Sequence, residues 1–177
     1  MLGRERLGSG GRRLEHPAQR AGAGGAGTWK SVALGGRHTC GIAGDDTMWC
    51  WGYNNYGQVG DNSTYTRTSP VPIGSATWKS VDAGGYHTCG IRTDAKLWCW
   101  GSNSKGQGGD GSATDRLYPV AVGSASWKSV TAGGQHTCGL EADNVRSCWG
   151  FGQRGQLGDG TTGDQLVPER IGGDLPN

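Results

Sequence analysis

A thirteen-residue segment that occurs three times constrains this chain more than any other feature. WKSVALGGRHTCG begins at Trp29, and close copies begin at Trp78 and Trp127. Both steps are 49 residues, and the Cys, Trp, Gln, Asp and Pro positions further on keep this step without an insertion. A period of about 20 to 50 residues is typical of repeat proteins, in which each unit buries its faces against its neighbours. The sequence therefore predicts an array of three units.

Composition limits how such an array is stabilised. The 177 residues include 36 glycines, eight tryptophans and one phenylalanine, so tryptophan must supply much of the buried area. No apolar run approaches the roughly 18 residues of a membrane span, and we expect no membrane partner.

The net charge of +2 is unevenly distributed. Residues 1–28 carry five arginines and two glutamates, which leaves 12 basic and 13 acidic side chains in the remainder. A near-neutral body offers no basic face for phosphates, so we expect no nucleic-acid partner. Residues 1–28 lack the repeat pattern and predict a disordered Arg- and Gly-rich tail, with an organelle transit segment or a wrongly assigned start codon as alternatives.

Each unit has the pattern of four short strands. In the first unit, residues 29–34 and 38–43 predict two strands separated by a Gly-Gly turn, and residues 48–53 predict a third after an aspartate turn. Residues 71–73 predict a fourth strand, whose flanking prolines suit the edge of a sheet. Four antiparallel strands per unit is the number found in a β-propeller blade.

The second and third strands form a hairpin in this interpretation. A turn centred on Asp45 places Cys40 opposite Cys50 and Gly41 opposite Trp49. We expect the indole of Trp49 to lie across this glycine. Both faces of the hairpin carry apolar or small side chains, which favours a sheet packed between neighbours on both sides.

The segments HTCG, LWCWGSN and GQxGDG, with the preceding strand and double glycine, resemble the repeat of the regulator of chromosome condensation family. The resemblance extends from Trp29 to Gly172 in three in-register copies. Members of that family form seven-bladed β-propellers that act chiefly by binding other proteins. Some promote nucleotide exchange on a Ran-type GTPase, and others belong to ubiquitin ligases or extracellular proteins.

Three units are less than half of such a ring. We therefore expect an all-β partial propeller, with three four-stranded antiparallel blades at 29–77, 78–126 and 127–177 in an open arc. The end blades would expose apolar faces, which predicts self-association or a longer parent chain. In the third unit Arg146 and Ser147 replace a hydrophobic residue and a tryptophan, which fits either a solvent-facing terminal blade or sequence drift.

The six cysteines occupy opposed strand positions. Such positions approach closely enough for a disulfide, and each bridge would stabilise the array by at most about 3 kcal/mol. Disulfides favour a secretory or extracellular location over the cytoplasm or nucleus. Reduced thiols are an alternative; zinc is another, but each unit supplies three ligands where structural zinc takes four. The expected pairs are Cys40 with Cys50, Cys89 with Cys99, and Cys138 with Cys148.

We expect neither catalysis nor a cofactor. The histidines and the GDG aspartates recur once per unit, whereas an active site usually needs one unique constellation, and no nucleophile elbow or phosphate-binding loop is present. The segments after the third strand differ most between units, and aromatic and arginine side chains on such loops are typical of protein-binding faces. The candidates are Tyr53, Tyr56, Tyr65, Arg67, Lys105, Arg116, Tyr118, Phe151 and Arg154.

These observations predict a non-enzymatic protein-binding propeller module, either a fragment or an assembling part of a larger propeller. The alternative is a guanine-nucleotide exchange regulator of a small Ran-like GTPase, which rests on the resemblance alone.

Overall fold

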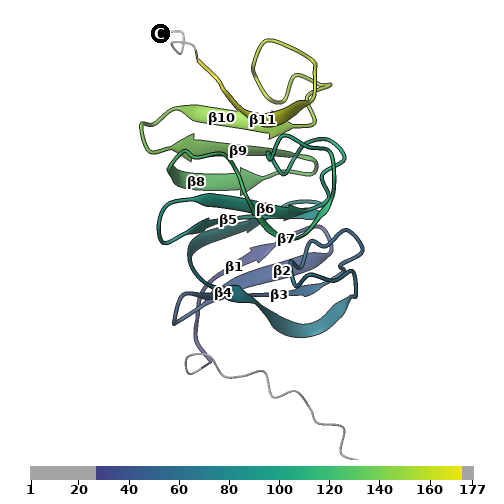
Figure 1. Cartoon of the computed structure of the whole chain (residues 1–177), viewed down its shortest axis with the longest axis vertical. Helices are drawn as coiled ribbons and strands as arrows, with labels where there is room; N and C mark the ends of the chain where they lie inside the picture. The colour runs from purple at the N-terminus through teal and green to yellow at the C-terminus, as the bar shows by residue number, and fades with distance from the viewer. Residues whose placement is uncertain (1–26, 173–177) are drawn as a thin grey trace, which may run out of the picture.

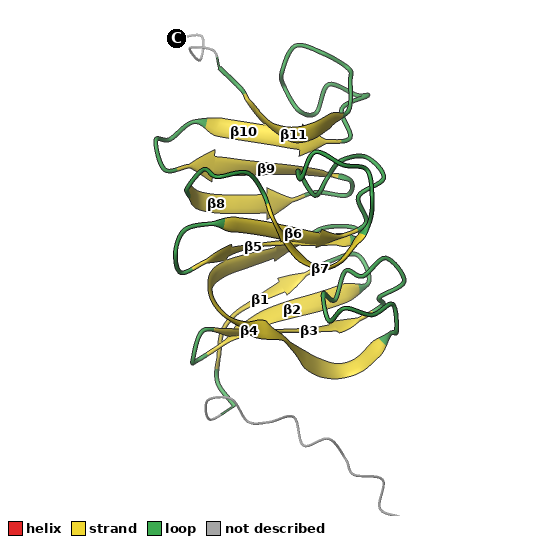
Figure 2. Ribbon diagram, in the orientation of Figure 1, coloured by secondary structure: helices red, strands yellow, loops and turns green. Residues whose placement is uncertain are grey.

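The computed structural model describes residues 27–172, which form β-strands and no helix (Figure 2). The tail predicted at residues 1–28 lies outside this range apart from its last two residues. The described residues accordingly contain no helix that could cross a membrane.

The first blade contains β1 (Trp29–Leu34), β2 (His38–Ala43), β3 (Thr47–Gly52) and the first part of β4 (Arg67–Ala83). These strands are antiparallel and follow one another in chain order. β4 is 17 residues long, and its second part pairs with the next blade. The blade boundary predicted after residue 77 therefore lies inside a continuous strand.

The other two blades repeat this arrangement (Figure 1). Because β4 is shared, β1 to β7 form one seven-stranded sheet, and the third blade is a separate four-stranded sheet. The three blades stack in chain order as an open partial propeller. The remaining strands are β5 (His87–Arg92), β6 (Leu97–Gly101), β7 (Arg116–Ala121), β8 (Trp127–Ala132), β9 (His136–Glu141), β10 (Arg146–Gly150) and β11 (Gln165–Arg170).

The predicted hairpin register is confirmed, because Cys40 pairs with Cys50 and Gly41 with Trp49. The prediction that the Trp49 indole lies across Gly41 was wrong. The ring next to Gly41 is that of Trp29, which would lie 2.7 Å from a Cβ added at Gly41. Trp29 comes from β1, and a bulge between Trp29 and Ser31 shifts the register there. The fourth strand begins at Arg67, four residues earlier than predicted. Its first part, which contains both prolines, pairs with β3, and only the part from Trp78 onward pairs with β5, so each proline can lack an N–H without costing a second row of hydrogen bonds.

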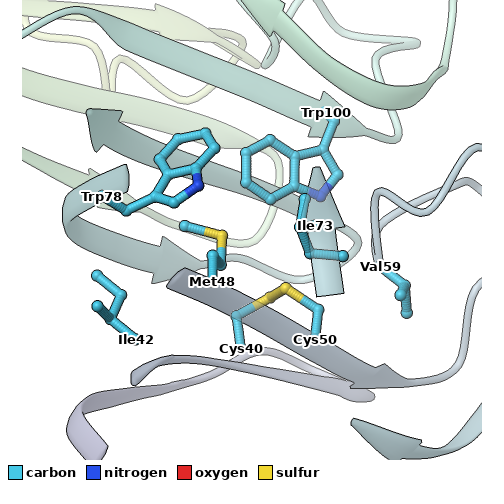
Figure 3. Close-up of a cluster of buried hydrophobic side chains, with 8 residues drawn as sticks. All are labelled: Cys40, Ile42, Met48, Cys50, Val59, Ile73, Trp78 and Trp100. Atoms are coloured by element: carbon cyan, nitrogen blue, oxygen red, sulfur yellow. A yellow bond between two sulfur atoms is a disulfide. The ribbon is translucent and has the colours of Figure 1, made fainter. Parts of the chain in front are cut away.

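The hydrophobic core lies between the blades. Figure 3 shows the side chains of the first blade, with the Cys40–Cys50 bridge at their centre, facing Trp78 and Trp100 of the second. Both indoles are 1 % exposed. Buried tryptophans thus supply the large apolar areas that a glycine-rich chain otherwise lacks. The second core repeats the pattern with Cys89, Ile91, Leu97, Cys99 and Val122 against Trp127 and Trp149.

All six cysteines are paired within their own hairpins, as Cys40–Cys50, Cys89–Cys99 and Cys138–Cys148. These are the pairs that the strand register predicts. The described chain therefore presents no thiolate for zinc, and it contains no cluster of three or more His, Cys, Asp or Glu side chains that could hold a metal.

Candidate protein-binding face

Two kinds of connection meet at one end of each blade. The long loop that follows the third strand packs beside the Gly-Gly turn that precedes the second strand, and these long loops lie along one side of the stack, at the right in Figure 2. A backbone hydrogen bond joins loop and turn in each blade: Tyr53 N donates to Arg37 O, Ser102 N to Tyr86 O, and Phe151 N to Gln135 O. Side chains from both connections therefore share one surface.

The long loops are held by polar contacts inside the loop. In the first blade Asn54 Nδ2 donates to Asp61 at 3.1 Å, Ser63 Oγ donates to Asp61 at 2.8 Å, and the Arg67 guanidinium pairs with the same carboxylate. Burial raises the pKa of Asp61, but hydrogen bonds from Ser63 and Arg67 outweigh it and hold the pKa below its ordinary value. Positive φ angles of 78° at Gly57 and 86° at Gly60 close the turn.

The second loop repeats this network, and the third varies it. Asp110 accepts from Ser112 at 2.8 Å and pairs with Arg116 at 2.6 Å. In the third blade Gln165 replaces the arginine and donates to Asp159 at 2.9 Å. The loops are therefore ordered supports for the side chains that project from them.

Three tyrosines from two blades form a cluster on this surface. The ring centroids of Tyr53 and Tyr56 are 6.3 Å apart, those of Tyr53 and Tyr86 6.2 Å, and those of Tyr56 and Tyr86 5.3 Å, all edge to face. The Arg37 guanidinium lies 5.8 Å from the centre of the Tyr53 ring. Tyr56 is exposed, and Tyr53 and Tyr86 are partly exposed.

The junction of the second and third blades continues the surface with a cation and an aromatic ring. Lys105 Nζ lies 5.5 Å from the centre of the Phe151 ring and 3.5 Å from the Asp164 carboxylate. Arg154 is exposed in the same loop as Phe151. We call the surface formed by these contacts the aromatic loop face, comprising Arg37, Tyr53, Tyr56, Tyr86, Lys105 and Phe151.

The structure brings some of the predicted binding residues together and separates others. Tyr53, Tyr56, Lys105 and Phe151 take part in the aromatic loop face, with Arg154 exposed in the third loop. Four others do not contribute to its ring contacts: Arg67 and Arg116 begin β4 and β7 and pair with loop aspartates, Tyr118 lies on β7, and Tyr65 is an exposed residue before β4. Their binding role remains a prediction.

Arg37 and Tyr86 were missed by the sequence analysis. Both stand immediately before the histidine of the repeated segment, where the third unit has Gln135. This position varies inside an otherwise constant GGxHTCG sequence. A variable position within a constant segment indicates an exposed side chain. The binding candidates were taken from the long loops alone, so this position was not among them.

The repeated histidines connect blades. Thr88 Oγ1 donates to the Gln58 carbonyl at 2.8 Å, so His38 Nε2, 2.7 Å from Thr88 Oγ1, is the donor in that contact. His87 makes the equivalent contact with Thr137 at 2.8 Å. Burial lowers the pKa of His38 to about 4; burial and the neighbouring histidines lower that of His87 to about 3. Both rings are therefore neutral structural donors at pH 7.

Comparison with known proteins relates the whole array to one repeat family. A sequence profile described as the Regulator of chromosome condensation (RCC1) repeat matches residues 45–91, 94–140 and 148–175, and a second profile of the same description matches residues 29–58 and 78–107. These matches cover most of the chain and all three blades.

Solved structures share the fold at low sequence identity. Yeast RCC1 (Prp20), in a complex with Kap60, superposes with a TM-score of 0.75 and 24 % identity, covering 82 % of this chain and 37 % of that one. Human WBSCR16 gives a TM-score of 0.74 and 21 % identity, covering 82 % of this chain and 38 % of that one. This chain thus spans little more than a third of the length of these proteins.

Proposed function

Because this chain belongs to the regulator of chromosome condensation (RCC1) repeat family, we propose that it is a non-enzymatic protein-binding module whose binding surface is the aromatic loop face. The observation that carries the proposal is the cluster of Tyr53, Tyr56 and Tyr86, which joins the long loop of the first blade to the Gly-Gly turn of the second. Tyrosine and arginine are enriched among the residues that dominate the binding energy of protein interfaces.

The charges around the cluster indicate the kind of partner. Arg37 lies against Tyr53, and Lys105 and Arg154 add two cations in the adjacent loops, of which Lys105 is partly neutralised by Asp164. The favoured partner is a protein segment that places an apolar or aromatic side chain among the tyrosines and an acidic group beside Arg37. The three disulfides support an encounter in an oxidising compartment.

The test removes the cluster and keeps a matched control. Tyr53, Tyr56 and Tyr86 are changed together to Ser in one variant. Tyr65 and Tyr118, which the sequence also predicts as binding residues but which lie outside the aromatic loop face, are changed to Ser in another, so the pair of variants tests which set binds. Proteins that the wild-type chain captures from a cell extract are identified and quantified by mass spectrometry. The affinity of the wild type and of each variant for a captured protein is then measured with purified components.

We expect the control to keep the partner and the cluster variant to weaken binding by about 100-fold, as loss of a hot spot does. Equal affinity for all three chains would remove the assignment of the site. Thermal unfolding of each variant verifies that the blades remain folded.

Nucleotide exchange on a small Ran-like GTPase is the second candidate. It is supported by the fold shared with yeast Prp20p, a protein studied for its binding to Gsp1p and histones, of which this chain spans 38 %. A nucleotide-release assay with a Ran-type GTPase decides it: accelerated release would establish exchange activity, and an unchanged rate would leave the binding module.

A further inference from the structure

The blades are held together by one interface that the chain uses twice. On one side stands the disulfide face of a blade, which in the first blade comprises Cys40, Ile42, Met48 and Cys50. On the other stands the tryptophan face of the following blade, which in the second blade comprises Trp78, Val81 and Trp100. The second and third blades repeat this contact with the corresponding residues.

Each use of this interface also carries the same hydrogen bonds. From the tryptophan face, Trp100 Nε1 donates to the Gln58 carbonyl at 2.9 Å, and in the next junction Trp149 Nε1 donates to the Gln107 carbonyl at 3.0 Å.

The disulfide face supplies a histidine ring and a backbone N–H in return. His38 contacts Thr88 at 2.7 Å, and Gly36 N donates to Gly84 O at 3.0 Å. The next junction repeats both contacts, His87 to Thr137 and Gly85 N to Gly133 O.

At the amino-terminal end of the described stack, a tryptophan face has no blade packed against it. Trp29 is 44 % exposed, whereas its counterparts Trp78 and Trp127 are 1 % and 2 % exposed. Val32 is 54 % and Leu34 76 % exposed on the same strand. Thr39 and Trp51 occupy the positions of the threonine and tryptophan that make the hydrogen bonds between blades.

The other end of the described stack presents the matching disulfide face. Cys138 and Leu140 are partly exposed there, although their counterparts in the first two blades are at most 2 % exposed. His136, Gly134 and the carbonyl of Gln156 occupy the positions that contact the next blade in the two internal junctions.

From this complementarity we infer that a second copy of the chain docks head to tail, with its tryptophan face of Trp29, Val32, Thr39 and Trp51 on the disulfide face of Cys138, Leu140 and Cys148. Each donor of one face then meets an acceptor of the other: His136 with Thr39, Trp51 Nε1 with the Gln156 carbonyl, and Gly134 N with Gly35 O. The two surfaces differ, so the contact is heterologous and the ends of the dimer remain free for further copies.

Arg146 fits this contact although it departs from the pattern. Arg146 occupies the position that Met48 has in the first blade. In the first junction the Met48 methyl carbon lies 3.1 Å from the place of a Cβ at Gly90, beside the ring of Trp78. The equivalent position in the docked pair places Arg146 beside Gly41 and the ring of Trp29, and one guanidinium nitrogen of Arg146 lies 4.0 Å from the place of a Cβ at Gly158. A similar stacking already exists within the second blade, where the Arg92 guanidinium lies 3.5 Å from the centre of the Trp98 ring.

Two substitutions block the faces one at a time. Val32→Asp places a carboxylate on the tryptophan face, and Leu140→Asp places one on the disulfide face. Arg146→Glu is a second variant of the disulfide face; because Arg146 is exposed, we expect the blade to stay folded. Tyr118→Asp, on the 54 % exposed Tyr118 of β7, is the matched control.

Sedimentation velocity over a range of concentrations measures the assembly of the full chain. We expect the wild type and the control to associate. For each blocked variant we expect the dissociation constant of self-association to rise about tenfold or more. Mixing Val32→Asp with Leu140→Asp restores one intact pair of faces, so we expect a 1:1 dimer and nothing larger.

Three outcomes would overturn the inference. A wild type that stays monomeric at several hundred micromolar shows that no second copy docks on either face. Association that survives both blocking substitutions places the contact elsewhere. Self-association of Leu140→Asp alone with the affinity of the wild type indicates that two tryptophan faces pair with each other.

Discussion

The two junctions between blades are alike at one end and different at the other. At the loop end, where the long loops lie, the histidine–threonine contacts are 2.7 and 2.8 Å long, and the tryptophan–carbonyl contacts are 2.9 and 3.0 Å long. At the turn end, where the hairpins close, the side chains have different chemistry in the two junctions.

In the first junction the Arg92 guanidinium lies over two indoles at the turn end, 3.5 Å from the ring centre of Trp98 and 5.2 Å from that of Trp78. In the second junction Glu141 and Ser147 stand at the positions of Arg92 and Trp98. Ser147 Oγ donates to Glu141 at 2.6 Å, Arg170 pairs with Glu141 at 2.5 Å, and a groove of about 500 Å³ opens beside them.

This difference shows which contacts determine how one blade stacks on the next. The loop end buries directional hydrogen bonds whose partners are spaced by the repeat, so any change there leaves a buried donor or acceptor unpaired. At the turn end the guanidinium groups of Arg92 and Arg170 reach solvent, and contacts of such exposed cations contribute little. The Ser147–Glu141 hydrogen bond is the buried contact at this end. Three predictions test this division.

Acidification is expected to have the largest effect, because it acts on the loop end of both junctions. The lowered pKa values of His38 and His87, about 4 and about 3, mean that the folded state keeps both rings neutral while the unfolded chain protonates near pH 6.5. The free energy of unfolding is therefore fully retained above pH 6.5 and falls below it, by about 1.4 kcal/mol per pH unit for each histidine. The loss continues to about pH 4 for His38 and to about pH 3 for His87.

Urea unfolding followed by tryptophan fluorescence at pH 7, 6, 5 and 4 measures this slope. In the variant His38→Gln/His87→Gln we expect the slope between pH 6.5 and 4 to become much shallower. The loop aspartates, whose pKa values are also lowered, act only below about pH 4. A stability that stays constant from pH 7 to 4.5 in the wild type would contradict the structural role of the histidines.

Removal of a buried indole is expected to be the next largest effect, and to be equal at both junctions. Trp100→Ala and Trp149→Ala each delete a side chain that is at most 1 % exposed and leave a carbonyl with one donor fewer, at a cost of about 3–5 kcal/mol. The matched variant Trp51→Ala, at the end face, should cost about 1 kcal/mol or less.

Dilute protein is used for these measurements, so that association does not bury Trp51. If Trp51→Ala and Trp100→Ala lowered the free energy of unfolding equally, packing between blades would not be the source of the stability that Trp100 contributes.

Substitutions at the turn end should have the smallest effects and differ between junctions. Arg92→Ala removes stacking over two indoles and should cost about 1 kcal/mol. Glu141→Ala leaves the buried Ser147 hydroxyl without its acceptor and should cost about 1–3 kcal/mol.

Glu141→Ala/Ser147→Ala removes both partners and should recover part of that loss, as determined from urea midpoints. A double variant less stable than Glu141→Ala would show that the serine contributes through another contact.

Much of the fold could be predicted from local pattern because the register of a hairpin depends on the residues between its strands. Asp45 and the alternation of side chains around it suffice to pair Cys40 with Cys50. The position of Trp29 over Gly41 could not be predicted in this way, because it depends on a bulge in a strand that approaches β2 from the other side.

The candidate site was predicted only in part for a similar reason. Tyr53 and Tyr56 stand out in a variable loop, but their neighbour Tyr86 belongs to the next repeat, and only the stacking of blades brings it within 5.3 Å of Tyr56. Arg67 looked like a free loop cation in the sequence, whereas the fold of the loop places it against Asp61.

The sequence by itself determined the unit, its number of strands, its hairpin register and its cystine pairs, because these follow from spacing and alternation within 49 residues. Only the tertiary structure decided which side chains of different units meet. Contacts between blades depend on how one sheet is rotated and displaced on the next, and that geometry is set by burial of whole faces, which no local pattern encodes.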